Sequence, residues 1–190
     1  MNVKFITVTA ILSSISAVLM MFSFPLPFFP PFIKFDISDF PALIGAFALG
    51  PMAGCAIELV KNLLHLTDTS SAGIGELANF IIGSAFVIPA GIIYKYNKTR
   101  IGALLGMVAG VVCMAIIGAL ANYYILFPFY KTIMPLEKII GMTQKFIPSV
   151  DSLWKVTLFS IVPFNLLKGT ILSLLAFLSY KHFSAIINRK

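Results

Sequence analysis

Long apolar stretches make up most of the chain, and short segments rich in proline or charge separate them. The stretches cover about residues 5–22, 40–66, 74–94, 101–126 and 152–180. Roughly 20 consecutive apolar residues are enough for a helix to cross the hydrocarbon core of a bilayer, so each stretch predicts at least one membrane-spanning helix. The connections contain residues that break helices, because residues 23–39 hold four prolines and residues 127–151 hold Pro128, Pro135 and Pro148.

Charged residues are scarce, at 11% of the chain against 59% hydrophobic residues. A soluble domain of ordinary composition has about 25% charged residues. The sequence therefore predicts an all-α integral membrane protein in which residues 1–190 form one transmembrane domain. The net charge of +7 does not indicate a nucleic-acid partner, because the basic residues are spread over loops and ends.

The number of spans depends on the stretch 40–66, which contains Gly50-Pro51 in its middle. A kink there gives five crossings, and a reversal gives six. Loops on the cytoplasmic side carry an excess of Lys and Arg. With six spans and an inner N-terminus, the inner segments hold Lys4, Lys95, Lys98, Arg100, Lys181, Arg189 and Lys190.

The same arrangement places every acidic residue in an outer segment or outer helix half: Asp36, Asp39, Glu58, Asp68, Glu76, Glu137 and Asp151. One observation does not fit the six-span arrangement: the outer connection also contains three lysines, Lys131, Lys138 and Lys145. With five spans, one basic cluster must lie outside. We therefore expect six transmembrane helices with both termini in the cytoplasm, a short second helix, and a long loop after the first.

Lys168 lies deep inside the apolar run from Val156 to Tyr180. A charge at membrane depth costs about 3 kcal/mol on insertion scales, and Asn165 falls on the same helical face. A cation and an amide on one face predict a binding site. The helices offer the ammonium no evident partner, so the carbonyl groups of a ligand are expected to supply one.

Other polar residues map to the outer halves of the spans. Glu58, Lys61, Asn62 and His65 follow helical spacing, which is also typical of an internal Glu–Lys pair at a helix end near the interface. Glu76 and Asn79 open one span, where Glu76 also suits a helix N-terminus, and Asn122 closes the next. A single solute site that opens outward would account for all of them.

Small residues form two further patterns. The first span presents Ala10, Ser13, Ser14 and Ala17 on one side, which favours close approach of a partner helix. Residues 102–110 contain glycine at every fourth position. This pattern indicates close packing of the helix, either inside the protein or against a partner.

Several kinds of chemistry are missing from the sequence. It contains no phosphate-binding loop of the GxxxxGK[ST] type, and neither histidine has a companion at metal-ligand spacing. No nucleophile lies beside a plausible base. We expect no enzymatic activity, no metal and no cofactor, and energy for uphill transport would come from another subunit or an ion gradient.

Three segments carry a resemblance to a known family: residues 35–51, residues 121–130 (ANYYILFPFY) and residues 162–169 (VPFNLLKG). Over essentially its whole length the chain resembles the riboflavin-specific substrate-binding (S) components of bacterial energy-coupling factor (ECF) vitamin transporters. The resemblance implies six helices, an outward vitamin site capped by the loop after helix 1, and ATP-driven uptake across the cell membrane. It also implies a membrane T component and two ATP-binding-cassette subunits as partners, docked through small residues of helix 1, here Ala10 with Ser14 or Ser13 with Ala17.

On this resemblance, Asn165 and Lys168 are expected to hold the pyrimidine edge of riboflavin, while Asn122 and Asn79 reach its remaining polar atoms. Asp36, Asp39 and Phe40 would close the pocket. Apolar walls for the dimethylbenzene end would come from Phe28, Phe29, Phe40 and Leu43. Two alternatives stay open: an S component for another vitamin, and a self-sufficient facilitator or channel, although a channel would need polar residues through the full membrane depth.

Overall fold

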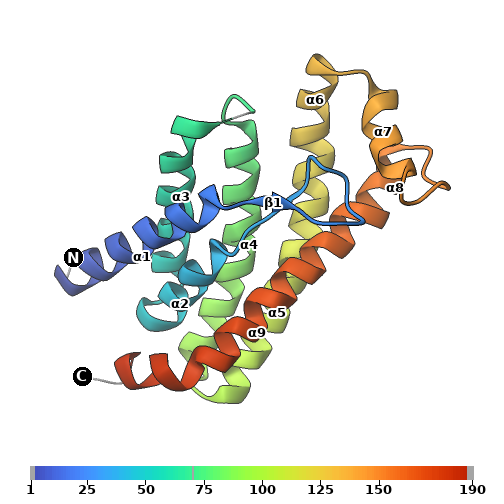
Figure 1. Ribbon diagram of the computed structural model, residues 1–190. Helices are drawn as coiled ribbons and strands as arrows, with labels where there is room; N and C mark the ends of the chain where they lie inside the picture. Colours follow the sequence, from blue (N-terminus) through green and yellow to red (C-terminus); the bar gives the residue numbers. More distant parts are fainter. Residues whose placement is uncertain (1–2, 70, 188–190) are drawn as a thin grey trace.

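The computed structural model describes residues 3–69 and 71–187, with the side chains of residues 3, 5–69 and 71–179. Most of the chain is helical (Figure 1). The first half contains α1 (Val3–Met21), α2 (Asp39–Leu49), α3 (Pro51–His65) followed by a 3-10 turn (Leu66–Asp68), and α4 (Ile74–Tyr96). The second half contains α5 (Arg100–Ala121), η2 (Asn122–Leu126), α6 (Phe127–Ile133), α7 (Leu136–Gln144), α8 (Leu153–Val156), η3 (Thr157–Ile161) and α9 (Val162–Ile187).

Among the residues that the structure describes, three helical stretches are long and apolar enough to cross a membrane: Ile74–Tyr96, Arg100–Ile133 and Leu153–Ser179. Two shorter apolar helices, Phe5–Met21 and Asp39–Leu49, accompany them. The expectation of a helical membrane protein is confirmed, while the count of six crossings stays a prediction. One departure from an all-α fold is a small antiparallel hairpin after α1, formed by β1 (Phe24–Pro25) and β2 (Lys34–Phe35).

The predicted break at Gly50-Pro51 is confirmed, because α2 ends at Leu49 and α3 begins at Pro51. Gly50 has a φ of 102°, a left-handed conformation that glycine adopts without steric cost. Proline is well tolerated at the first position of a helix, where its missing N–H has no intrahelical partner anyway. The two residues thus end one helix and start the next.

The glycine pattern in α5 serves packing inside the protein. A Cβ atom added to Gly110 would lie 2.5 Å from the carbonyl oxygen of Phe86, and one added to Gly106 would lie 2.7 Å from that of Ala90. Both carbonyls belong to α4, so α4 and α5 approach too closely there for any side chain. The main core forms where these two helices meet α2 and α9, around Leu43, Phe86, Tyr94, Met107 and Leu172.

The expected end of a helix near Pro128 is wrong. The helix that begins at Arg100 continues to Ile133 through η2, a π-helical turn in which the N–H of Phe127 donates to the carbonyl of Asn122. A second π turn, η3, precedes Pro163. Proline lacks an N–H and its ring crowds the turn before it. A widened turn accommodates that ring and lets both helices continue.

The segment between α1 and α2 crosses the bundle and packs against the start of α6 and of α9 (Figure 1). Ile33 and Phe35 join a second apolar cluster with Phe127 and Phe164. The rings of Phe29 and Phe164 meet edge to face at 5.4 Å. This segment therefore covers one end of α6 and α9.

Candidate ligand-binding site

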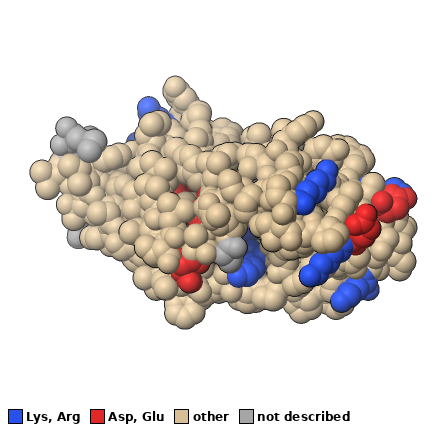
Figure 2. Space-filling model, turned by 90° about the horizontal axis from the view of Figure 1, so that it is seen from above, with Lys and Arg blue, Asp and Glu red and all other residues tan. Residues whose placement is uncertain are grey.

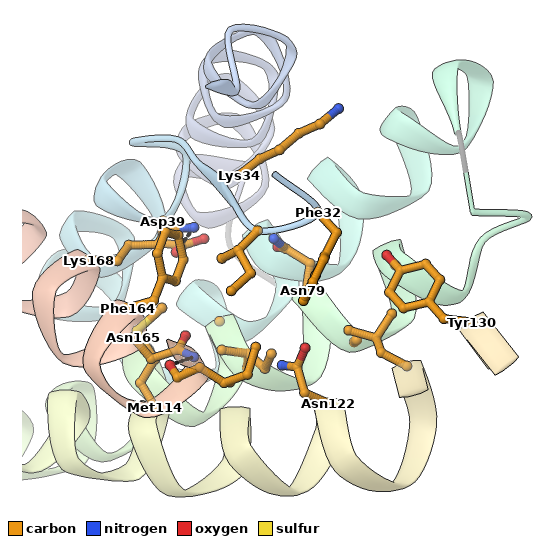
Figure 3. Close-up of a pocket in the computed structure, with 17 residues that line it drawn as sticks. Phe32, Lys34, Asp39, Asn79, Met114, Asn122, Tyr130, Phe164, Asn165 and Lys168 are labelled. Carbon is orange, nitrogen blue, oxygen red and sulfur yellow. Dashed lines mark hydrogen bonds and ion pairs between the residues drawn. The ribbon is translucent and has the colours of Figure 1, made fainter. Parts of the chain in front are cut away.

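A cavity of about 120 Å³ lies beneath the hairpin, among α4, η2 and α9. Its wall combines polar and apolar side chains, of which Figure 3 labels Phe32, Lys34, Asp39, Asn79, Met114, Asn122, Tyr130, Phe164, Asn165 and Lys168. Ile82, Leu126 and Ile161 also line it. A second cavity of about 410 Å³ shares Phe32, Lys34, Gly75, Asn79, Leu126 and Tyr130 with the first. The two adjoin, and the second extends past His65 and Asp68 toward the α3–α4 loop.

Lys168 is the central cation of the site and is 4% exposed. Its Nζ lies 3.0 Å from Oδ2 of Asp36 and 2.9 Å from Oδ2 of Asp39. The expectation that the protein offers this ammonium no partner is therefore wrong. Asp36, just before α2, and Asp39, the first residue of α2, supply two carboxylates, whose attraction offsets part of the cost of burying the charge.

The two carboxylates are themselves held in place. Oδ1 of Asp36 accepts a hydrogen bond from the N–H of Ser38 at 2.9 Å, and the Ser38 hydroxyl also donates to it. Oδ1 of Asp39 pairs with Lys61. The ammonium of Lys168 thus has a fixed position instead of a flexible one.

Glu58 and Lys61 form the expected pair, with 2.8 Å between Oε2 and Nζ. Both side chains are fully buried within the protein, and their location near the interface stays a prediction. They pack below the cavity wall, at the side of α3 that faces α2 and α4.

Three asparagines bring carboxamide groups to the cavity. Nδ2 of Asn122 donates to the carbonyl of Gly118 at 2.8 Å, and Nδ2 of Asn165 donates to that of Ile161 at 2.9 Å. These bonds fix the two side chains by their amide nitrogens and leave their oxygens for a ligand. Oδ1 of Asn79 is buried and has no hydrogen-bond partner among the described residues. A bound molecule with N–H or O–H groups would satisfy it.

The structure brings together five of the residues that the sequence singled out: Asn165, Lys168, Asn122, Asn79 and Asp39. Asp36 borders the outer cavity. Phe40 packs against the main core, and Leu43 is fully buried within it. Leu43 lies one helical turn after Asp39, about 6 Å farther along α2, so it shares the helix face of Asp39 but lies at another depth.

The apolar walls come largely from residues that the sequence did not single out. Phe32, Met114, Tyr130 and Phe164 line the cavity, whereas Phe28 is 79% exposed. Lys34 reaches the rim from β2 and points away from the other labelled side chains in Figure 3. Tyr130 and Phe164 lie within two of the three segments that carry the family resemblance, and this was the one sequence signal that pointed to them.

A separate network orders the α3–α4 loop at the mouth of the outer cavity. Glu76 lies 3.0 Å from Nδ1 of His65 and accepts hydrogen bonds from the hydroxyls of Thr69 and Ser71. Glu76 therefore connects the end of α3 to the loop before α4, in addition to lying in the first turn of α4. Figure 2 shows this end of the molecule, where most visible atoms belong to uncharged residues.

Residues 4–180 match the family model described as the ECF transporter, substrate-specific component. The chain belongs to this family. It is 33% identical over 188 residues to a protein named riboflavin transporter RibU from Staphylococcus aureus, covering 99% of this chain and 94% of that one. It is 34% identical over 176 residues to riboflavin transporter FmnP from Bacillus subtilis, covering 91% and 88%.

A solved structure described as the S component of a bacterial ECF transporter matches with a TM-score of 0.76 and 31% identity, over 98% of both chains. The family consists of transporter components, so this S component is a membrane transport protein and not an enzyme.

The small residues of α1 in this S component face two directions. Ser13 is 1% exposed and packs inside the protein, next to Ser16, whose hydroxyl donates to the carbonyl of Ser38. Ala10 and Ser14 are exposed, and Ala17 is half-buried. Of the two docking registers that the sequence left open, only Ala10 with Ser14 lies wholly on the surface.

Proposed function

We propose that this protein is the riboflavin-binding S component of an ECF-type transporter. It captures riboflavin from outside the cell for ATP-driven uptake with a T component and two ATP-binding-cassette subunits. Two relatives that cover nearly the whole chain are named riboflavin transporters. The observation that carries the proposal is the pairing of a fixed ammonium with carboxamides in one cavity beside aromatic rings.

The chemistry of the cavity suits a flavin. The pyrimidine edge of riboflavin has one N–H between two carbonyl groups, which the carboxamide of Asn165 can match with paired hydrogen bonds. An ammonium has three donors, and Lys168 uses two of them on Asp36 and Asp39. The third can donate to a carbonyl or ring nitrogen of the flavin, a charge-assisted bond made stronger by burial.

The remaining parts of the ligand also find partners. The hydroxyls of the ribityl chain can donate to the free oxygens of Asn79 and Asn122. The dimethylbenzene ring can pack against Phe32 and Phe164. Ligand sites span about 300–1,000 Å³, and the two adjoining cavities of about 120 and 410 Å³ together reach that range.

The packing below the cavity favours a binding pocket over a self-sufficient channel. Phe86, Val87 and Ala90 of α4 are fully buried, as is Leu172 of α9. Gly106 and Gly110 bring α5 into contact with the α4 backbone at the same level. A continuous polar path would have to cross this apolar core.

Purification of the protein from cells in mild detergent tests the proposal. We expect yellow protein with the visible absorption of a flavin, and quenching of riboflavin fluorescence when the emptied protein is titrated. Thiamine and biotin are the matched controls for an S component of another vitamin. Protein that contains no flavin and does not bind added riboflavin would refute the assignment.

We also propose that the α2–α3 turn and the α4–α5 turn both face the cytoplasm. Residues of the two turns line one cavity, which includes Gly50, Pro51, Met52, Lys95 and Lys98. The positive-inside rule assigns this basic end to the cytoplasm. Arg189 and Lys190, which supported the same assignment in the sequence, lie outside the described residues.

Cysteine labelling checks this orientation. Met52 is 74% exposed and Tyr96 is 84% exposed at the basic end, while Phe28 is 79% exposed at the other end. In a protein without Cys55 and Cys113, we expect Met52→Cys and Tyr96→Cys to react only from the cytoplasmic side and Phe28→Cys only from outside. Labelling of Met52→Cys and Tyr96→Cys from opposite sides would contradict the six-span topology.

A further inference from the structure

A row of buried charges extends from the cavity into the protein. Lys168 contacts Asp39, Asp39 contacts Lys61, and Lys61 contacts Glu58. Figure 3 shows the cavity end of the row, where Asp39 and Lys168 lie together. Lys61 is fully buried and lines neither of the two adjoining cavities. Its charge therefore needs a reason other than contact with the ligand.

The two lysines differ in how many protein oxygens surround their ammonium groups. Lys61 donates hydrogen bonds to Oδ1 of Asp39 and to Oγ of Ser38 at 3.0 Å, and its Nζ forms an ion pair with Oε2 of Glu58 at 2.8 Å. Lys168 has two oxygen neighbours, Oδ2 of Asp36 and Oδ2 of Asp39. Lys61 is therefore enclosed by the protein, whereas Lys168 lines the cavity and has a third N–H for it.

Asp39 connects the two lysines through different oxygen atoms. Its Oδ1 pairs with Lys61 and its Oδ2 with Lys168. Because each oxygen has its own cation, the carboxylate has a fixed orientation. Without Lys61, Oδ1 would lose its cation and would be free to turn toward Lys168, where it would compete for the third hydrogen of that ammonium.

We propose that Lys61 is a positioning residue for the ligand site: it holds Oδ1 of Asp39 and so keeps one N–H of Lys168 directed at the cavity. The inference rests on the proposed function, since the affinity for riboflavin is its readout. Lys61 reaches Lys168 directly through Asp39, and by a longer path through Ser38 and Asp36. Its removal should weaken binding even though it does not reach the cavity.

The test is a double-mutant cycle between Lys61 and Asp39 in a Glu58→Gln background. The cluster has three carboxylates and two ammonium groups, Asp36, Asp39, Glu58, Lys61 and Lys168. Removing Lys61 alone would leave an additional uncompensated charge. In Glu58→Gln protein, Lys61→Met restores the net charge of the parent cluster, which protects the fold.

We expect Lys61→Met to weaken riboflavin binding about tenfold in the Glu58→Gln background. In Glu58→Gln/Asp39→Asn protein, the same replacement should change the affinity by less than about twofold, because the group that Lys61 positions is gone. Lys155→Met is the matched control. Lys155 forms an exposed ion pair with Asp151 at 2.6 Å, and its loss should leave the affinity unchanged.

Melting temperatures of all four cluster variants separate positioning from folding. Equal losses of affinity in both backgrounds, or losses that follow the melting temperature, would overturn the inference. An unchanged affinity on replacing Lys61 would do so as well. Failure of the parent protein to bind riboflavin would instead refute the proposed function, and this is measured first.

Discussion

Joint replacement of Lys168 by methionine and Asp36 by asparagine is expected to weaken riboflavin binding by about ten- to a hundredfold. The exchange removes the single free donor of the buried ammonium. A hydrogen bond that involves a charged group contributes about 1.5–3 kcal/mol, and each 1.4 kcal/mol changes the affinity about tenfold. Titration of riboflavin fluorescence measures the effect.

The two replacements are made together because Lys168 and Asp36 form an ion pair of 3.0 Å. Loss of Lys168 alone would leave an unpaired buried carboxylate, which typically costs about 3–5 kcal/mol of stability. Asp36→Asn alone is the control, since it keeps the ammonium and its contact with Asp39. If the joint variant binds riboflavin as tightly as the parent, Lys168 is structural and the proposed site is wrong.

Ser14→Trp is expected to abolish riboflavin uptake while leaving riboflavin binding by the isolated protein within about twofold of the parent. Ser14 and Ala10 are exposed on α1 and leave room for a partner helix to approach closely, which a tryptophan would prevent. Uptake of labelled riboflavin by cells that contain the whole transporter is the assay.

Ile15→Trp is the matched control, because Ile15 is 46% exposed but lies about 100° around α1 from Ser14. Ile15→Trp protein should support riboflavin uptake at the rate of the parent. Ser13→Trp should instead lower the stability of the protein, since Ser13 is buried. Parallel loss of binding and uptake in Ser14→Trp would indicate packing within the protein and not docking.

Features that are rare in this composition could be predicted from the sequence. A lysine inside an apolar run is conspicuous, and so is Gly50-Pro51 in the middle of one. The helix break at Gly50-Pro51 is confirmed, and Lys168 lies buried at a cavity, while its contact with a ligand stays a prediction. The aromatic wall could not be predicted in the same way, because 18 phenylalanines make no single one stand out.

The partners of Lys168 were missed for a different reason. Asp36 lies 132 positions earlier in the chain, so no local pattern connects the two residues. Both aspartates were assigned to the site, but as groups that close it. Their pairing with the ammonium depends on how α2 packs against α9, which helical periodicity does not specify. Tertiary packing also extended the helix through Pro128.

The π turns have a consequence for how the length of these helices can change. A π turn holds one extra residue within an α-helix, whereas an extra or missing residue in a regular α-helix rotates everything after it by about 100°. Phe164, Asn165 and Lys168 all follow η3, so deleting one residue of η3 would close it to an ordinary α turn and leave all three directed at the cavity. A change of length by a single codon would therefore be tolerated within η3, although the same change in a regular part of the helix would replace the whole set of side chains that α9 presents to the ligand.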